Sequence, residues 1–260
     1  MEVLCDLLFE LSNEDRLQIL QELEQGNLRL SHVAQKLDFT VQETTRNVAR
    51  LVNAKLVART PSGVYEVTSY GHQAIRLLDG YRFLSKHSGY FVDHSLIELP
   101  YKFQLRIGEL NECKPVKRLM DTFGIIEKIL REVEEYYLYI TNETLSTASG
   151  YQLSLRAHNS GVQGKGIKPT GFTRSRILSD NVPEEVWDKL GSFKAKGSLE
   201  NKYLERIDFG LFMSEKEVLF DFPDKDGNFD YVGFTSTDEK AVEWCKDVFG
   251  YYWEIASSIY

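Results

Sequence analysis

The chain has 260 residues, of which 42% are hydrophobic and 27% are charged, and this composition excludes disordered, collagen-like and low-complexity proteins. No apolar run reaches the roughly 18–20 residues that a bilayer span needs, and the amino terminus lacks the basic segment of a signal peptide, so we expect a cytoplasmic protein of one or two domains. Three widely spaced cysteines without a C-x-x-C pair predict reduced thiols and no zinc site.

Basic residues are unevenly distributed in a chain whose formal net charge is −8. The segment from Arg29 to Arg59 contains six basic and two acidic residues, and residues 144–179 contain five basic and no acidic residues. Lys and Arg bind phosphate groups by displacing counterions. These two segments are therefore the candidates for contact with nucleic acid or with an anionic ligand.

The amino-terminal part of the chain predicts three helices. Residues 12–15 combine a capping side chain with first-turn acids, and Ser31 and Thr40 are expected to cap the next two helices. The predicted helices run from the first cap to Gly26, over residues 31–37, and from Val41 to about Ala54.

A β-hairpin is predicted directly after the third helix. The β-rich runs 55–60 and 64–68 are joined by Pro61-Ser62-Gly63, which is strong turn punctuation. Three helices followed by a hairpin are typical of a winged helix-turn-helix.

The third helix presents side chains that suit a major groove. We expect Val41, Thr45, Val48 and either Leu51 or Val52 to face inward, which leaves a polar face outside. Arg can pair with guanine, Asn or Gln with adenine, and Glu with cytosine, although Glu would also repel phosphate. The outward residues expected at bases or nearby phosphates are Gln42, Glu43, Arg46, Asn47 and Arg50. The residues expected to hold the DNA backbone are Ser31, Lys36, Thr40, Arg59 and Ser62.

Residues 44–57 resemble the recognition helix and following strand of ArsR-type winged-helix transcription regulators. Lys55 stands where that pattern has Gly, so we expect the helix to end differently here. The absence of a Cys pair on these helices does not support metal sensing. The alternative interpretation is a three-helix protein-interaction module.

The rest of the chain predicts a larger α/β domain. A helix from about residue 71 to 83 is expected to lead away from the hairpin and to serve in dimerisation. The segments that follow resemble the effector domain of archaeal methanogenesis regulatory proteins, which joins such a winged helix to an α/β sensor. The segments that carry the resemblance are residues 91–100, 103–110, 208–213, 226–230 and 244–256.

The predicted fold class is therefore α+β, with a winged helix-turn-helix joined by helices to a larger α/β effector domain that has a mixed sheet. We place the DNA-binding domain at residues 1–80, a helical connector at 81–118 and the effector domain at 119–260.

Periodicity within the larger domain predicts a parallel β-α-β unit. A helix capped by Asp121 buries Phe123, Ile126, Leu130 and Val133, and it precedes a buried strand at residues 136–140. A helix over residues 152–158 and a strand at 176–178 complete the unit.

A hairpin and a final helix are predicted after that unit. Residues 209–213 and 218–222 pair around a tight turn, and Asp226-Gly227 marks another turn. The final helix, from Thr237, carries an apolar stripe that fits the core of the chain or, as the alternative, a subunit interface. The stripe consists of Ala241, Cys245, Val248, Tyr252, Ile255 and Ile259.

The acid-free segment 144–179 is the candidate ligand site, for an anionic effector. Four glycines in it free backbone N–H groups beside positive charges. The candidate ligand-binding residues are Arg156, His158, Lys165, Lys168, Arg174 and Arg176. A solvated basic loop or a secondary DNA contact would also explain this segment. Nearby aromatic residues fit a core better than a pocket.

Catalytic signatures are missing. The sensor of the resembled family is similar to the sheet of phospholipase-D-like proteins, whose chemistry uses His-x-Lys, yet none of the five histidines is followed two places later by Lys. A calcium-type loop at residues 224–235 has Gly at the fourth position instead of the sixth, so a hairpin turn is the better interpretation. We therefore expect a homodimeric, sequence-specific transcriptional regulator that binds double-stranded DNA, without catalytic activity, metal or cofactor. The alternatives are an unconventional phosphodiesterase-like hydrolase and a protein-interaction module.

Overall fold

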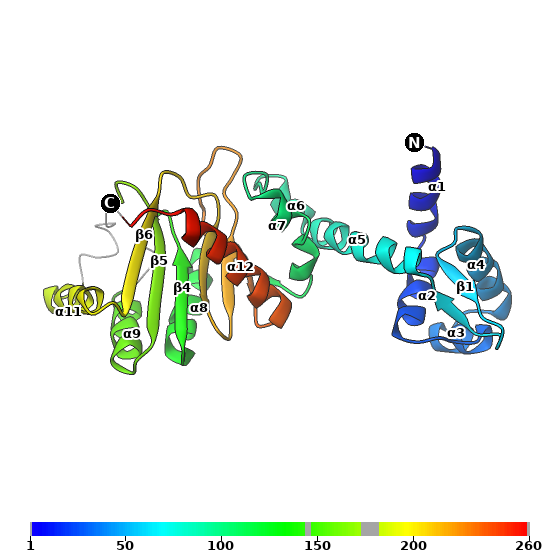
Figure 1. The fold of residues 1–260 in the computed structure, drawn as a ribbon, viewed down its shortest axis with the longest axis horizontal. Coiled ribbons are helices and arrows are strands. Elements are labelled where there is room, and N and C mark those ends of the chain that lie inside the picture. The colour runs from blue at the N-terminus through cyan, green and yellow to red at the C-terminus, as the bar shows by residue number, and fades with distance from the viewer. Residues whose placement is uncertain (1, 144–146, 173–181, 259–260) are drawn as a thin grey trace. The chain divides into compact units, whose positions relative to one another are not determined.

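The structure is a computed structural model that describes residues 2–143, 147–172 and 182–258. The chain divides into two compact units, residues 1–81 and 82–260 (Figure 1). Among the described residues, no helix is both long and apolar enough to cross a membrane. All three cysteines are free thiols, with Cys113 and Cys245 buried and Cys5 exposed.

The amino-terminal unit consists of helices and one two-stranded antiparallel sheet. The hairpin strands β1 and β2 follow α4 directly and pair in the register Val57↔Val67 to Arg59↔Tyr65. This is the element order predicted from the sequence, preceded by one helix that was not predicted, α1. The elements are α1 (Glu2–Leu11), α2 (Glu14–Gln25), α3 (Leu30–Leu37), α4 (Val41–Asn53), β1 (Val57–Arg59), β2 (Tyr65–Val67) and α5 (Ser69–Lys86).

Local capping explains where these helices begin and end. Asn13 caps α2 by accepting from the backbone N–H of Arg16, and Gly26 ends that helix. Thr40 and Glu43 form a reciprocal capping box at the start of α4. The prediction that Ser31 caps α3 is wrong, because that helix begins one residue earlier, at Leu30, and has no side-chain cap.

A separate apolar core holds the amino-terminal unit together. Ile19, Val33, Val48 and Leu51 from three helices pack with residues of the hairpin and α5. Arg16 is buried among them and donates to the backbone carbonyl oxygens of Phe9 and Glu10. A cation at the carboxyl end of α1 compensates the negative end of that helix dipole.

The larger unit contains a seven-stranded mixed sheet in the order β3-β9-β8-β7-β4-β5-β6. Strands β4, β5 and β6 are parallel, and the other pairs are antiparallel. The predicted α+β class with a mixed sheet is confirmed. The elements are α6 (Ser88–Phe91), α7 (Tyr101–Gln104), the 3-10 helix η1 (Ile107–Leu110), β3 (Lys114–Val116), α8 (Leu119–Glu132), β4 (Tyr136–Ile140), α9 (Ala148–Asn159), β5 (Gln163–Pro169), α11 (Glu184–Ala195), β6 (Leu199–Leu204), β7 (Gly210–Ser214), β8 (Val218–Asp221), β9 (Gly233–Ser236) and α12 (Glu239–Ile255).

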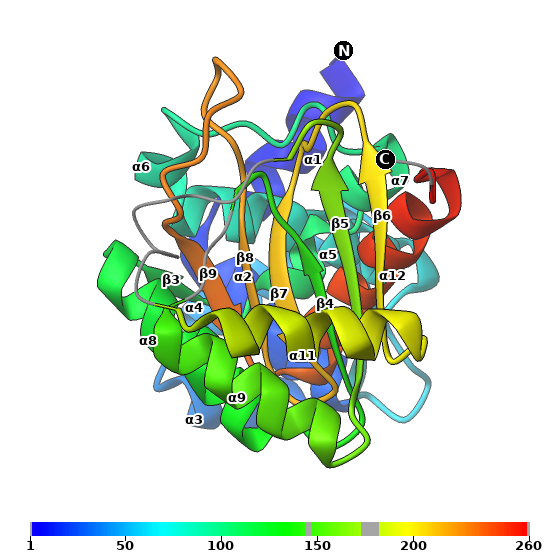
Figure 2. The ribbon, with the colours of Figure 1, turned by 90° about the vertical axis from the view of Figure 1, so that its left-hand side faces the viewer.

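Helices cover both faces of this sheet. Figure 2 shows α8, α9 and α11 in front of one face, with α12 behind the other. Strand β4 contributes side chains to the apolar cores on both faces of the sheet, because alternate side chains point to opposite faces. Tyr137 and Tyr139 belong to the core under α8 and α9, whereas Leu138 and Ile140 belong to the core with α12. Connector residues such as Phe103 also enter the α12 core.

The parallel β-α-β unit is present, but its second strand differs from the prediction. Strand β5 is the glycine-rich segment 163–169 itself, paired with β4 from Tyr136↔Gln163 to Ile140↔Ile167. The strand predicted at residues 176–178 lies outside the described residues. Glycine normally weakens strand propensity, so this segment was interpreted as a loop.

Two predictions about helix details need correction. Helix α8 begins at Leu119 after Arg118, so Asp121 does not cap it; Asp121 lies in its first turn and forms an ion pair with Arg118. The stripe on α12 is buried in the core from Ala241 to Tyr252, but Ile255 is 56% exposed, and Ile259 lies outside the described residues. Helix α12 is capped by Asp238 and begins two residues later than predicted.

Candidate functional site

The outer face of α4 exposes part of the predicted DNA-binding set. Gln42 and Arg46 are both exposed, and neither side chain forms a hydrogen bond or ion pair within the described part of the chain. Glu43 is exposed too, but its carboxylate accepts from the backbone N–H and the hydroxyl of Thr40. These capping bonds lower the pKa of Glu43. Gln42 and Arg46 are thus the side chains available for a partner.

The remaining residues predicted at bases are engaged within the unit. The prediction that Asn47 faces outward is wrong, because Asn47 is only 4% exposed and its amide donates to Asp15 at 3.3 Å. The inward face comprises Thr44, Asn47, Val48 and Leu51. Val41 and Thr45 are exposed instead of inward, since the stripe of Thr44, Val48 and Leu51 at helical spacing sets the buried side.

Arg50 forms an ion pair with Glu10 of α1 while its side chain stays 43% exposed. This contact raises the pKa of Arg50 and lowers the pKa of Glu10. Arg50 therefore joins α4 to α1, and its guanidinium group is only partly available to a phosphate.

The residues predicted at the DNA backbone lie on three elements. Lys36 on α3 forms an ion pair with Glu22 at 2.8 Å, and Ser31 on the same helix is exposed. Thr40 is used as the cap of α4. In the hairpin, Arg59 lies over the ring of Tyr65, and Ser62 is hydrogen-bonded to Thr60.

Among the described residues, the predicted anion-binding side chains do not converge on one site. Lys168 lines the pocket described below, but Lys165, three residues earlier on β5, contacts the ring of Trp253 on α12 at 5.3 Å. Arg156 is exposed on α9. His158 is buried and bonded to the Tyr137 hydroxyl and the Val162 carbonyl group. Arg174 and Arg176 lie outside the described residues.

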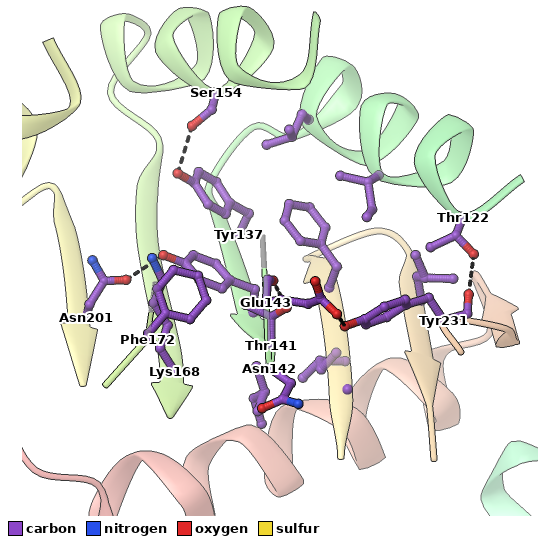
Figure 3. A pocket seen from close by; sticks show the side chains of 18 of the residues that line it. Thr122, Tyr137, Thr141, Asn142, Glu143, Ser154, Lys168, Phe172, Asn201 and Tyr231 are labelled. Carbon is purple, nitrogen blue, oxygen red and sulfur yellow. Dashed lines mark hydrogen bonds between the residues drawn. The ribbon is translucent and has the colours of Figure 1, made fainter. Parts of the chain in front are cut away.

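A cavity of about 410 Å³ is lined by residues of the sheet and of helices α8, α9 and α11. It extends past the carboxyl ends of β4 and β5, because Thr141 and Asn142, which follow β4, and Phe172, which follows β5, belong to its lining (Figure 3). Ligands of open α/β sheets bind at the carboxyl ends of such strands. The aromatic side chains that line the cavity are Tyr137, Tyr139, Tyr151, Phe172, Trp187, Tyr203, Phe212, Phe220, Phe229 and Tyr231.

Glycines of β5 make room for the tyrosines of β4. A Cβ atom on Gly164 would lie 2.7 Å from Cζ of Tyr137, and one on Gly166 would lie 2.0 Å from Cζ of Tyr139. The glycine-rich segment is therefore a packing surface for two pocket-lining rings, and its role differs from the anion loop that the sequence suggested.

Hydrogen bonds fix several pocket residues in place. The Tyr137 hydroxyl lies 2.7 Å from Nε2 of His158 and 3.0 Å from the Ser154 hydroxyl. Burial lowers the pKa of His158 and raises the pKa of Tyr137 to about 12, so both groups are neutral. The Tyr139 hydroxyl on β4 donates a hydrogen bond to the side-chain oxygen of Asn201 on β6, as Figure 3 shows.

A second group of bonds holds the opposite side of the pocket. The Tyr231 hydroxyl donates to Glu143, and Thr122 of α8 donates to the backbone carbonyl group of Tyr231 (Figure 3). Tyr231 has a positive φ of 60°, which is uncommon for a residue with a side chain. These contacts hold the Tyr231 ring at the pocket wall.

The pocket also contains the carboxyl group of Asp221 at the end of β8. A Cβ atom on Gly210 would lie 2.0 Å from its Oδ1, and one on Gly233 would lie 2.7 Å from its Cβ. Its Oδ2 is buried and has no hydrogen-bond partner in the described part of the chain. Burial, with the negative charge of Asp230, raises the pKa of Asp221 well above its usual range.

Sequence reasoning missed Asp221, Glu143 and Asn201 as pocket residues. Position relative to predicted strands was the available signal for Glu143 and Asp221, because Glu143 follows strand 136–140 and Asp221 is the last residue but one of the predicted strand 218–222. For Asn201 the sequence offered no such signal, since β6 was not predicted.

Comparison with known proteins identifies part of the larger unit. Residues 175–255 match the model of the middle domain of the methanogenesis regulatory protein FilR1. The resemblance predicted from the sequence is confirmed over this stretch. Within the described residues, the matched stretch includes α11, strands β6 to β9 and α12.

Other comparisons are more distant. No curated protein matches the chain. TrmBL2, an archaeal chromatin protein with a novel mode of DNA binding, aligns over 95% of this chain and 94% of its own at 15% identity, with a TM-score of 0.43. NucT from Helicobacter pylori aligns over 56% and 99% at 10% identity, with a TM-score of 0.41. Because both TM-scores lie below 0.5, neither similarity carries an argument about function.

Proposed function

We propose that the chain is a DNA-binding transcriptional regulator whose larger unit responds to a small ligand in the pocket. DNA binding is inferred from the exposed pair Gln42 and Arg46, which lie four residues apart on one face of the capped helix α4. Such a pair faces the same direction on successive turns, and both side chain types can read base edges. The match to a regulatory protein supports the same conclusion.

Backbone contacts would come from the neighbouring elements. Lys36 on α3 and Arg59 on the hairpin are cationic and exposed, and they flank α4 in sequence. In winged helices the recognition helix enters the major groove while such residues hold phosphates. Arg50 contributes less because its guanidinium group is shared with Glu10.

The pocket is physically connected to the segment that follows α5. The β8–β9 loop, residues 222–232, carries Phe229 and Tyr231 into the pocket. The same loop is bonded on its other side to the connector, where the backbone N–H of Ser95 donates to Pro223 and Nε2 of His94 lies 3.2 Å from Asp230. A ligand that moves this loop would therefore move the connector.

We propose a homodimer with an interface on the amino-terminal unit. Large apolar side chains are exposed on α1 and α5, including Val3 at 81% and Leu77 at 72%. Exposed apolar surface of this kind usually marks a protein contact, and most such contacts in oligomers are between identical copies. The larger unit is proposed to bind its ligand without catalysing a reaction, since the chain has no His-x-Lys pair.

Fluorescence anisotropy with the DNA upstream of the protein's own coding region tests the DNA-binding proposal. Arg46→Ala should weaken binding to the specific sequence by roughly 5–150-fold, equivalent to the loss of about 1–3 kcal/mol for a base contact, and should leave binding to scrambled DNA less affected. Lys36→Ala should weaken both sequences alike and lower the salt slope by about one.

Arg156→Ala is the matched control, because it removes an exposed arginine from the larger unit and leaves the amino-terminal unit unchanged. Equal loss on both sequences for Arg46→Ala would refute the assignment of base contact. Absence of DNA binding by the unmodified chain at low salt would refute the regulator proposal and favour a protein-interaction module.

A further inference from the structure

The positively charged residues of the pocket lie on one side and an acidic residue lies on the other. Lys168 on β5 and Lys194 on α11 lie on one side, whereas Asp221 on β8 is on a strand three places away in the sheet. Neighbouring strands are about 4.8 Å apart, so β5 and β8 are roughly 14 Å apart. One end of the cavity is therefore cationic and the other is acidic.

The cationic end is already matched by aromatic rings. The Nζ atom of Lys168 lies 4.5 Å from the ring centre of Phe172 and 5.6 Å from that of Tyr139. Both rings therefore already interact with the ammonium group of Lys168. A ligand cation beside Lys168 would meet charge repulsion and would compete with the lysine for these two rings.

The acidic end has no cation from the described residues. The titratable groups next to Asp221 are Asp230, Tyr90 and Tyr231, and Glu143 is bonded to Tyr231; none of these groups is a cation. Asp221 forms no ion pair within the described ranges, and its Oδ2 is buried without a partner. A buried carboxyl group with an unpaired oxygen is energetically unfavourable.

Aromatic rings surround this acidic end. Phe229 and Tyr231 are stacked with ring centres 6.3 Å apart, and Phe212 lines the cavity from β7, the strand next to β8. The Tyr231 ring is held by its bonds to Glu143 and Thr122. Aromatic faces beside a carboxyl group are the usual environment for an organic cation in proteins.

We propose that the pocket binds an organic amine, with its ammonium group against Asp221 and its apolar body among the rings of Phe212, Phe229 and Tyr231. This rests on the proposed function only in placing the ligand in the same pocket. An anionic ligand, which the basic segment of the sequence suggested, would meet Asp221 and Glu143 at this end. The ammonium would lie against the Asp221 carboxyl group, which lines the pocket, and its positive charge would favour the ionised form of that group.

Three indole compounds of nearly equal size test the proposal: tryptamine with an ammonium group, tryptophol with a hydroxyl group and indole-3-acetate with a carboxylate. Binding to the full chain at pH 7 is measured by isothermal titration calorimetry. We expect tryptamine to bind at least tenfold more tightly than tryptophol, and indole-3-acetate to bind most weakly. Tighter binding of the acetate, equal binding of all three, or no binding by any of them overturns the proposal.

The Asp221→Asn variant identifies the group responsible. It should bind tryptamine and tryptophol with affinities within about threefold of each other, because the carboxyl group that selects the ammonium is gone. Asp226→Asn, the same change at an exposed position of the β8–β9 loop, should keep the full preference. Preserved amine selectivity in Asp221→Asn would show that another group binds the cation. Circular dichroism confirms folding, and Glu143→Gln provides a second acidic-end variant if Asp221→Asn does not fold.

The outcomes separate this inference from the proposed function. Binding of the operator with no preference for tryptamine leaves the regulator proposal intact and refutes the amine. A clear preference for tryptamine in a chain that binds no DNA supports the amine site and refutes the regulator proposal.

Discussion

At the scale of single residues, small side chains set the shape of the pocket. Gly166 lies under the ring of Tyr139, and Gly210 lies against the carboxyl group of Asp221. Each glycine leaves space for a larger neighbour on the adjacent strand. The composition of β5 therefore follows from the rings of β4 that it must accommodate, and this explains how such a glycine-rich segment forms a strand.

Gly166→Ala should destabilise the larger unit by about 1–3 kcal/mol, because the added methyl group would overlap the Tyr139 ring and force it from its position. Displacement of that ring should also weaken tryptamine binding. Urea unfolding followed by circular dichroism measures the first effect, and calorimetry measures the second.

Gly124→Ala provides the control for this change. A Cβ atom on Gly124, in helix α8, would have nothing within 4 Å, so the variant should gain up to about 1 kcal/mol from the higher helix propensity of Ala. Equal stability changes in the two variants would contradict the packing role of Gly166.

Asp221 should make stability depend on pH. The pKa of Asp221 is raised in the folded protein, so its neutral form is favoured there, and folding becomes less favourable as the pH rises above the pKa of the unfolded chain. The loss is at most about 1.4 kcal/mol per pH unit and continues until the folded pKa is reached. Below the unfolded pKa this penalty is absent.

The Asp221→Asn variant should therefore be more stable than the unmodified chain at pH 7, and this advantage should shrink toward pH 4. Asn stays neutral at both pH values. Urea unfolding at pH 4, 5.5 and 7 gives the difference in free energy of unfolding. The exposed Asp226→Asn change should show no such trend, and a flat difference for Asp221→Asn would mean that this carboxyl group is ionised without penalty.

Residue-level predictions from the sequence were correct where spacing alone decides and wrong where tertiary contacts decide. Gln42 and Arg46 are exposed as predicted because they lie opposite Val48 and Leu51 on α4. Asn47 borders the apolar stripe, and the helical spacing predicts that it faces outward. Its amide is buried because it donates a hydrogen bond to Asp15 of α2. Such a partner, 32 residues away, has no signature in the local pattern.

At the scale of elements, regular patterns were predictive and mixed ones were not. The capped α4, the hairpin β1–β2, strand β4 and the hairpin of β7 and β8 all agree with the predicted elements, because each combines clear periodicity with turn or cap residues. Strand β5 was missed because its glycines lack the β-branched side chains that usually mark strands. Strand β6, residues Leu199–Leu204, was not predicted because its middle residues are mostly polar and half-buried, so no alternating apolar pattern marks it.

The connector is the element whose contacts the sequence revealed least. Tyr90 on α6 accepts from the backbone N–H of Phe222 at 3.0 Å, and its hydroxyl lies 3.2 Å from the carbonyl oxygen of Val232. Its ring stacks on His94 at 3.9 Å. One side chain therefore contacts both ends of the β8–β9 loop, which lines the pocket on its other side.

At the scale of the whole molecule, the proposed regulation requires that ligand and DNA affect each other. If tryptamine changes operator affinity by some factor, operator DNA must change tryptamine affinity by the same factor, because the coupling free energy is reciprocal. Typical couplings of about 1–3 kcal/mol correspond to factors of roughly 5–150. Anisotropy titrations with and without tryptamine, and calorimetry with and without DNA, measure both directions.

Tyr90→Phe should reduce this coupling while leaving each separate affinity nearly unchanged. The variant loses the hydroxyl that bonds the connector to both ends of the β8–β9 loop, yet it changes no residue proposed to contact DNA or ligand. The coupling factor should fall toward one, with a stability cost of about 1–3 kcal/mol from the unpaired backbone groups. Tyr101→Phe, the same change at a connector position that is 69% exposed, should keep the coupling. If Tyr90→Phe retained the full factor in both directions, the signal would have to leave the pocket by another route.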